Sequence, residues 1–277
     1  SMADYRIGFK WWALIIAVVF VISELVCVAC VPERPVACDE KTGKISDMFK
    51  ALFKNDQAMT VVVSIILVYT SLNICGNLVL YFFRFDVGNE GAYSVFAAVA
   101  FAAQVLVMMV IPLLRKRFSK GCLFISGFII QIAGFAVILI MAFAKLYTPQ
   151  SWYILCLPGI LIYLGYGMLN VIMTIFLSDS VDYGEVMNGT REESVIFSMQ
   201  TFTVKLASGV AVFLAGLVVD WIHLDTAAAV QTQDTLDALR MWMTIPSVIL
   251  LIVGIFVFKR FYRLDDARME EIKSKLN

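Results

Sequence analysis

Charged residues and histidine are scarce in this sequence of 277 residues: 16% are Asp, Glu, Lys or Arg, and His223 is the only histidine. A catalytic set at membrane depth needs a His/Asp pair or paired aspartates, so this scarcity argues against an enzyme. Basic and acidic residues number 22 each, which gives a formal charge of zero, and no nucleic-acid partner is expected. Runs that alternate apolar and polar residues are also missing, which excludes strands as the main architecture.

Long apolar runs are abundant, because 61% of the residues are hydrophobic. A soluble domain cannot keep so much apolar surface out of water, whereas a helix that crosses a hydrocarbon core of about 30 Å needs about 20 such residues. Lipid-exposed backbone must bond within a helix or a closed barrel, and these runs lack the alternation of barrel strands. The sequence therefore predicts an all-α polytopic membrane protein. Its seven predicted spans are 11–31, 60–83, 92–114, 121–144, 152–178, 194–220 and 241–261.

Basic residues divide unevenly between the two sides of the membrane that these spans define. Links 32–59, 115–120 and 179–193 and the tail 259–277 carry 16 of the 22, the opposite side carries 5, and Lys205 lies inside a span. The positive-inside rule therefore places the first group, and with it the C-terminus, on the cytoplasmic side of a cell inner membrane. All five tryptophans fall at predicted outer ends, as an aromatic belt does.

Six cysteines lie in or beside the predicted spans, and the stretch "CVACVPERPVAC" raises the question of a metal site. Its spacings match no zinc pattern, and His223 is predicted on the opposite side of the membrane, so no metal-binding set is assigned. The first apolar run is long and contains Glu24 without a small-residue cleavage site, so no cleavable signal peptide is expected.

The link after the first span carries "KISDMFKALFKNDQ", in which apolar side chains recur with a helical period. Those residues are Ile45, Met48, Phe49, Leu52 and Phe53. The pattern favours an amphipathic helix in the cytoplasmic interface, with its lysines near anionic headgroups; an ordinary solvated linker helix is the alternative. The tail "RLDDARMEEIKSKLN" predicts another short helix, since acids precede lysines along it.

Three predicted spans carry a polar stripe along one helical face. The second span has Tyr69, Asn73, Asn77 and Tyr81. The fifth has Gly159, Tyr163, Gly167, Asn170 and Thr174, and the sixth has Ser198, Thr201, Lys205 and Ser208 with Gln200 beside them. A helix that faces only lipid needs none of these, so they predict a shared water-accessible cavity, although single Asn, Ser and Thr side chains also serve to join helices.

Lys205 is the strongest indication of a binding cavity. An uncompensated lysine near the centre of a span costs about 2.5–3.5 kcal/mol on insertion scales, and its ammonium is too far from either end of the span to reach the interface. Amides, hydroxyls and tyrosine rings of the kind found in the stripes suit a sugar, although other polar solutes fit them as well. Glu24 is the other charge within a span, and it is either a cation or proton site or a partner for a neighbouring helix.

The stretch "DSVDYGEVMNGTREESVIFSMQTFTVKLASG" resembles the region of the tenth and eleventh helices in the glycoside–pentoside–hexuronide:cation symporters, the melibiose permease family of the major facilitator superfamily. "VPERP", "FKN" and "FYRLDDARMEEI" extend the resemblance over most of the chain. It implies a sugar symporter that works by alternating access, is driven by Na⁺, Li⁺ or H⁺ and holds no cofactor. The seven spans then correspond to helices six to twelve, without the first-bundle helices that hold the family's cation ligands.

The stripes and the resemblance together divide the chain and assign its site. Residues 1–31 correspond to the last helix of the N-terminal bundle, 32–59 to the central cytoplasmic loop, 60–261 to the C-terminal six-helix bundle and 262–277 to a tail helix. Residues predicted to bind a glycoside are Lys205, Gln200, Thr201, Asn73, Asn77, Tyr81, Tyr163 and Asn170. Residues predicted to gate the cytoplasmic side through ion pairs are Asp179, Asp182, Glu185, Arg191 and Glu192.

The expected partners are a sugar or glycoside, the lipid bilayer, and either an N-terminal six-helix half or a second copy of the chain. Two alternatives to a half-symporter stay open: a self-associating half-transporter, and a membrane assembly protein that transports nothing. Seven spans argue against simple self-association, because an extra helix disturbs twofold packing.

Overall fold

The computed structural model describes residues 2–30, 53–189, 193–228 and 230–276, which fall into two compact units. The first unit is Ser1–Gly43, and its described part is the helix α1 (Met2–Cys30). The side chains of α1 are exposed from Lys10 onward, and Glu24 is among them. The amphipathic helix predicted in the link after the first span lies almost entirely outside the described residues.

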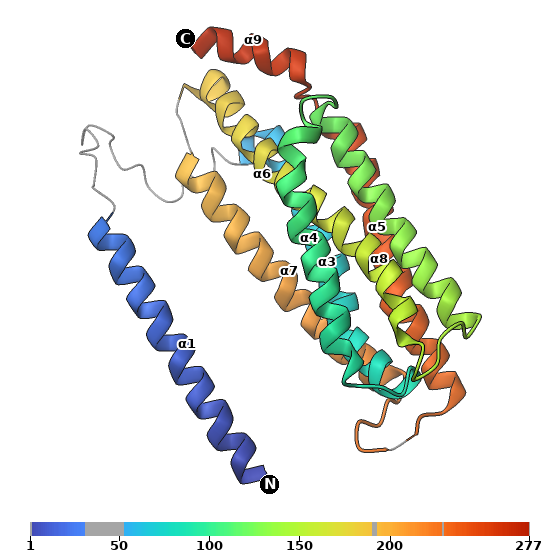
Figure 1. The fold of residues 1–277 in the computed structure, drawn as a ribbon. Coiled ribbons are helices and arrows are strands. Elements are labelled where there is room, and N and C mark those ends of the chain that lie inside the picture. Colours follow the sequence, from blue (N-terminus) through green and yellow to red (C-terminus); the bar gives the residue numbers. More distant parts are fainter. Residues whose placement is uncertain (1, 31–52, 190–192, 229, 277) are drawn as a thin grey trace. The chain divides into compact units, whose positions relative to one another are not determined.

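The second unit, Lys44–Asn277, is a bundle of long helices (Figure 1). Counting α1, seven helices in the described part of the chain are long and apolar enough to cross a membrane, and no strand occurs there. The prediction of an all-α protein with seven membrane-length helices is therefore confirmed. The α-helices of the second unit that the structure describes are α3 (Asp56–Tyr81), α4 (Ala92–Leu114), α5 (Lys120–Phe143), α6 (Cys156–Asn188), α7 (Glu193–Trp221), α8 (Gln233–Phe261) and α9 (Asp266–Leu276). A π-helical turn (Phe82–Asp86) extends α3, and a 3-10 turn (Trp152–Leu155) precedes α6.

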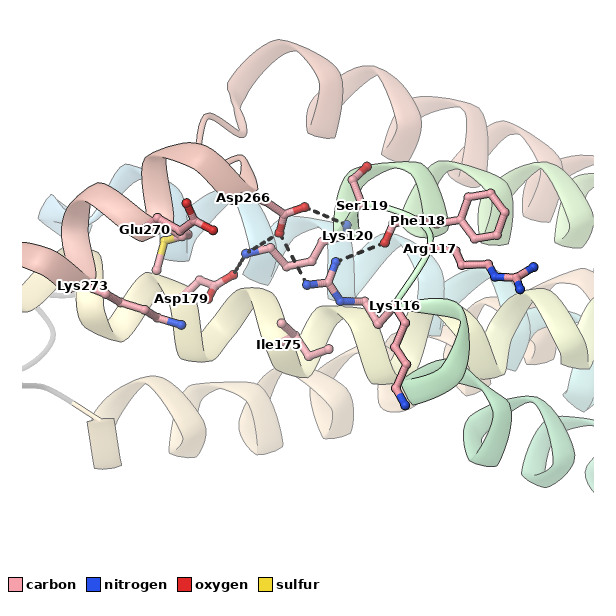
Figure 2. Close-up of a pocket in the computed structure, with 12 residues that line it drawn as sticks. Lys116, Arg117, Phe118, Ser119, Lys120, Ile175, Asp179, Asp266, Glu270 and Lys273 are labelled. Atoms are coloured by element: carbon pink, nitrogen blue, oxygen red, sulfur yellow. Dashed lines mark hydrogen bonds and ion pairs between the residues drawn. The ribbon is translucent and has the colours of Figure 1, made fainter.

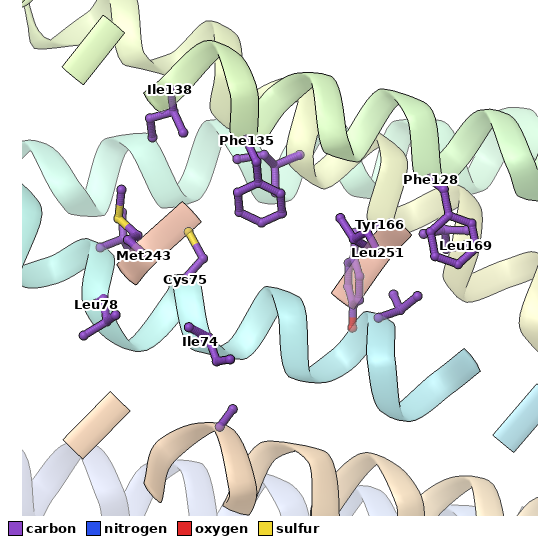
Figure 3. Close-up of a cluster of buried hydrophobic side chains, with 14 of the residues drawn as sticks. Ile74, Cys75, Leu78, Phe128, Phe135, Ile138, Tyr166, Leu169, Met243 and Leu251 are labelled. Atoms are coloured by element: carbon purple, nitrogen blue, oxygen red, sulfur yellow. The ribbon is translucent and has the colours of Figure 1, made fainter. Parts of the chain in front are cut away.

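The core of the second unit is apolar and rich in phenylalanine. Helix α3 packs against α6, α7 and α8, and α5 packs against α6 and α8. Figure 3 shows Phe128 and Phe135 of α5 among side chains from α3, α6 and α8, and both are fully buried. Phe124 of α5 lies 4.4 Å from Phe258 of α8 between ring centroids. Inside a membrane such packing contacts drive helix association, because lipid is as apolar as the side chains.

Glycines allow α6 to approach its neighbours closely. A Cβ atom on Gly165 would lie 2.6 Å from the backbone nitrogen of Gln131, so α5 and α6 touch through their backbones there. A Cβ on Gly159 would lie 2.4 Å from the Phe96 ring of α4. Small residues at such positions are the usual means of close helix packing in membranes. The predicted stripe of the fifth span therefore includes a glycine that serves packing against α4.

The predicted link at 179–193 is helical as far as Asn188, which corrects the prediction that the fifth span ends at 178. Helix α6 continues to Asn188 and ends at Gly189, whose positive φ of 73° is the left-handed conformation that glycine adopts readily at a helix end. The extension packs on the start of α3, where the Asn55 side-chain amide donates a hydrogen bond of 2.8 Å to the carbonyl of Ser180. This tertiary contact outweighs the turn propensity of Asp, Gly and Asn in the stretch.

Helix α8 also begins earlier than its apolar run predicts, at Gln233 rather than at 241. Thr232 caps it, since its hydroxyl accepts a hydrogen bond of 3.2 Å from the backbone nitrogen of Thr235. Arg240, expected in an outer loop, therefore lies inside the helix and is buried. Counting apolar residues ends the predicted span at such a charge. In the folded protein the helix continues, because the buried charge has acidic partners.

Candidate functional site

The polar stripes of α3, α6 and α7 meet in the structure. The Asn170 amide of α6 donates a hydrogen bond to the Tyr69 hydroxyl of α3. One turn further along α6, the Thr174 hydroxyl accepts a hydrogen bond of 3.5 Å from the Gln200 amide of α7. These side chains are half-buried or exposed, so they form a polar face that a ligand can reach.

Three tyrosines line this polar face. The rings of Tyr69 and Tyr166 meet edge to face, with centroids 5.5 Å apart, and Tyr163 lies 6.5 Å from Tyr166 in the same geometry. Tyr166 is absent from the residues predicted from sequence, although it follows Tyr163 by three residues and precedes Asn170 by four and so shares their helical face. Near the far end of α3, Tyr81 stacks on Phe85 with centroids 6.5 Å apart. Aromatic faces of this kind suit the apolar side of a sugar ring.

The asparagines of α3 keep most of their hydrogen-bonding capacity. Asn73 donates a hydrogen bond of 2.7 Å to the carbonyl of Tyr69, and Asn77 donates one of 2.7 Å to the carbonyl of Asn73. Each bond uses one amide hydrogen, so the side-chain oxygen and the second hydrogen remain available to a ligand or to water.

Lys205 lies on α7 and is exposed. Thr201, one turn before it, is exposed as well, and its hydroxyl donates to the carbonyl of Phe197 at 3.3 Å. Within the described part of the chain, Lys205 has no hydrogen bond and no ion pair. Its helix packs mainly on α3, which carries the asparagine stripe. Glu24 lies on α1, in the other unit.

One end of the bundle carries a charged network that includes one predicted gating residue (Figure 2). The Lys120 ammonium pairs with Asp179 of α6 and lies 3.5 Å from Asp266 of α9. Arg115 lies 3.4 Å from the same Asp266 carboxylate. The Lys120 and Asp179 side chains are 6% and 7% exposed, so this is a buried ion pair. Burial and the nearby carboxylates raise the pKa of Tyr262, whose hydroxyl has no hydrogen-bond partner in the described part of the chain.

The other gating residues divide between two groups. Asp182 and Glu185 lie on the same extension of α6 as Asp179, and both have partners. Arg191 and Glu192 lie outside the described residues. Sequence reasoning missed Lys120 as the partner of Asp179 and Asp266 as a second carboxylate on Lys120, although all three fall on the predicted cytoplasmic side.

The opposite end carries a second buried charged cluster, which sequence reasoning missed. The Arg240 guanidinium donates two hydrogen bonds to Asp86, one of them 2.9 Å long from Nε, and its third nitrogen lies 2.7 Å from Asp237. Arg240 and Asp86 side chains are each 3% exposed. The Tyr147 hydroxyl also donates to Asp86. Burial, and the carboxylate that accepts this bond, raise the pKa of Tyr147.

Comparison with known proteins gives one family. A family model described as MFS/sugar transport protein matches residues 3–266. An uncharacterized symporter of Bacillus subtilis is 24% identical over 91% of this chain and 54% of its own length. The raffinose carrier protein of Pediococcus pentosaceus is 23% identical over 86% of this chain and 36% of its own length. The isoprimeverose transporter of Lactiplantibacillus pentosus is 24% identical over 91% of this chain and 52% of its own length. This chain thus spans between 36% and 54% of the length of these relatives.

Proposed function

Because this chain belongs to the family of MFS/sugar transport proteins, as its resemblance to the glycoside–pentoside–hexuronide:cation symporters predicts, we propose that it forms the C-terminal half of a sugar symporter. The transported solute would be a glycoside, as the names of the raffinose and isoprimeverose relatives suggest. Na⁺, Li⁺ or H⁺ would drive the transport. The chain itself performs no covalent chemistry in this proposal.

The observation that carries the proposal is the meeting of the three polar stripes. Tyr69, Asn170 and Gln200 come from helices far apart in sequence, and hydrogen bonds join α3 to α6 and α6 to α7 across this face. Amide and hydroxyl groups in this arrangement match the alternating donors and acceptors of vicinal sugar hydroxyls. Lys205 supplies a cation on α7 that pairs with none of the described residues, and an intramembrane charge marks a ligand path by default.

Alternating access assigns a role to the charged end of the bundle. Rocking one bundle against another exposes a central site to each side in turn. We place the end with Lys120 and Asp179 in the cytoplasm of the cell inner membrane, following the positive-inside rule. Asp182 and Glu185, on the same end of α6, would then exchange ion pairs with a partner bundle as the cytoplasmic side opens and closes.

The relative lengths of this chain and its relatives support a partner for this half. The exposed α7 face that bears Lys205 would line a central path only when a second bundle covers it. That bundle is an N-terminal six-helix half in our proposal, and a second copy of this chain is the alternative.

Counterflow of labelled glycosides into proteoliposomes tests the proposal. Galactosides, xylosides and glucuronides are offered to vesicles that hold this chain alone, or this chain with the part of the isoprimeverose transporter that it does not match. We expect counterflow only with the added part. We also expect it to vanish in Lys205→Ala and to persist in Lys259→Ala, which removes an equal charge from an exposed position at the end of α8.

Three results would contradict this reading in different ways. Counterflow by the chain alone would favour the self-associating half-transporter. Silence in every combination, with correctly folded protein, would favour an assembly protein without transport. Equal activity of Lys205→Ala and Lys259→Ala would remove Lys205 from the substrate path.

A further inference from the structure

A pocket of about 520 Å³ lies where the α4–α5 turn, the last third of α6 and α9 meet (Figure 2). Lys116 and Arg117 come from the turn, Ile175 from α6, and Lys273 from α9. Figure 2 shows Lys273 and Lys116 on either side of Ile175. The pocket adjoins the end of α4 and the start of α5, two helices long and apolar enough to cross a membrane, so in a bilayer it would lie near the headgroups.

The pocket is distinct from the polar stripe that we propose as the sugar path. Ile175 of the pocket directly follows Thr174 of the stripe along α6, so the two side chains lie about 100° apart around the helix. Asp179, which also lines the pocket, lies about 7.5 Å beyond Thr174 along the axis at 1.5 Å of rise per residue. A ligand of the pocket is therefore a separate molecule, and its presence does not depend on the transport that we propose.

Charges in the pocket are only partly neutralised by the protein. Lys120 and Arg115 use Asp179 and Asp266 in the buried network, which also fixes the wall of the pocket. Lys116, Arg117 and Lys273 have no ion pair within the described residues, and Glu270 is the remaining carboxylate in the lining. The walls therefore present an excess of positive charge. The matching ligand is an anion whose oxygens accept from several ammonium and guanidinium groups, and a phosphate does so.

We propose that this pocket binds the phosphate headgroup of an anionic phospholipid. Two features favour a lipid over a free anion. Ile175 and Met269 give the pocket an apolar part, which a free phosphate does not use. Leu113, one turn before Lys116 on α4, is 61% exposed, so an acyl chain could lie along α4 below a headgroup held by Lys116. Basic pockets between membrane helices are known sites for anionic headgroups.

The test measures lipid binding to the whole purified chain in phosphatidylcholine nanodiscs that contain increasing phosphatidylglycerol. Bound phosphatidylglycerol is counted by native mass spectrometry after gentle release. The pocket variant is Lys116→Gln with Lys273→Gln, and the matched control is Lys259→Gln with Arg260→Gln, an equal loss of charge on the last turn of α8. We expect phosphatidylglycerol affinity to fall at least tenfold in the pocket variant, since each lost ammonium donates directly to the phosphate in our proposal and such a bond contributes roughly tenfold or more. The control removes no such contact and should change the affinity less than the pocket variant, by about twofold.

A second arm identifies the source of the phosphate. Inorganic phosphate is added to the same chain in discs of phosphatidylcholine alone, and thermal unfolding is followed by circular dichroism. We expect phosphatidylglycerol to raise the unfolding midpoint and inorganic phosphate to leave it unchanged. Equal stabilisation by both would overturn the lipid assignment in favour of a free anion. Equal loss of lipid in the pocket and control variants would overturn the pocket itself, leaving only general surface charge. If the double variant fails to fold, Lys116→Gln and Lys273→Gln are each compared with Lys259→Gln.

Discussion

Removal of the Asp86 carboxylate should be among the most damaging single changes in the second unit. Asp86 lies in the turn that extends α3, and it accepts hydrogen bonds from Tyr147 in the loop after α5 and from Arg240 in α8. Its carboxylate therefore joins three parts of the bundle. In Asp86→Ala the Arg240 guanidinium, 3% exposed, keeps Asp237 as its only ion-pair partner among the described residues, and that side chain is 36% exposed. The Tyr147 hydroxyl loses its acceptor at the same time.

The expected magnitude follows from those two losses. Removing one member of a buried ion pair costs about 3–5 kcal/mol, because the other charge stays buried without compensation. An orphaned buried hydroxyl adds about 1–3 kcal/mol, although the two terms overlap because both groups bond the same carboxylate. We expect Asp86→Ala to lower the free energy of unfolding by about 4 kcal/mol in total. Unfolding by dodecyl sulfate in mixed micelles, followed by far-ultraviolet circular dichroism, measures it.

Two further variants separate the ion pair from other effects of the substitution. Asp220→Ala removes an exposed carboxylate at the end of α7 and should change stability by less than about 0.5 kcal/mol. Asp86→Leu combined with Arg240→Met replaces both charges by apolar side chains and should recover most of the loss, since buried pairs exchange for apolar groups at little cost. The reasoning is refuted if Asp86→Ala is as stable as Asp220→Ala, or if the double variant is less stable than Asp86→Ala alone.

Two more predictions concern a titration and a close approach. The pKa of Tyr147 is raised above its ordinary value of about 10, so the stability that it contributes is full below that pH and is lost as the pH rises further. Between pH 10 and 11 the wild type should therefore lose up to about 1.4 kcal/mol more than Tyr147→Phe, measured by the same micelle unfolding; parallel curves would contradict the raised pKa. Gly165→Ala should cost about 1–3 kcal/mol, because its Cβ would meet backbone atoms of α5 at 2.6 Å. Gly209→Ala on α7, which meets nothing within 4 Å, should be neutral or stabilising by about 1 kcal/mol, and equal effects of the two alanines would contradict the packing account.

The spans could be predicted well from sequence because each one is selected by its own hydrophobicity, independently of the others. Hydrophobic length decides whether a helix crosses, and that property is local to each run. Two of the differences lie where a run meets charge: α6 continues through Asp179, and α8 begins before Arg240. In each case the charge is neutralised by a residue distant in the chain, Lys120 or Asp86. Counting apolar residues along one run takes no account of that distant partner, so it predicts a loop where the helix continues.

The candidate site was predictable to the level of helical faces and no further. Spacing by four residues places Asn73 and Asn77 on one side of α3, and the structure keeps them there. Which helix that side meets is a property of packing, and the hydrogen bond from Asn170 to Tyr69 depends on how close α6 comes to α3. Lys205 illustrates the complementary case. The cost of burying this lysine in a membrane is evident from its position in one helix. Its partner lies outside this bundle in our proposal, so neither the periodicity of α7 nor the packing of α7 on α3 can identify that partner.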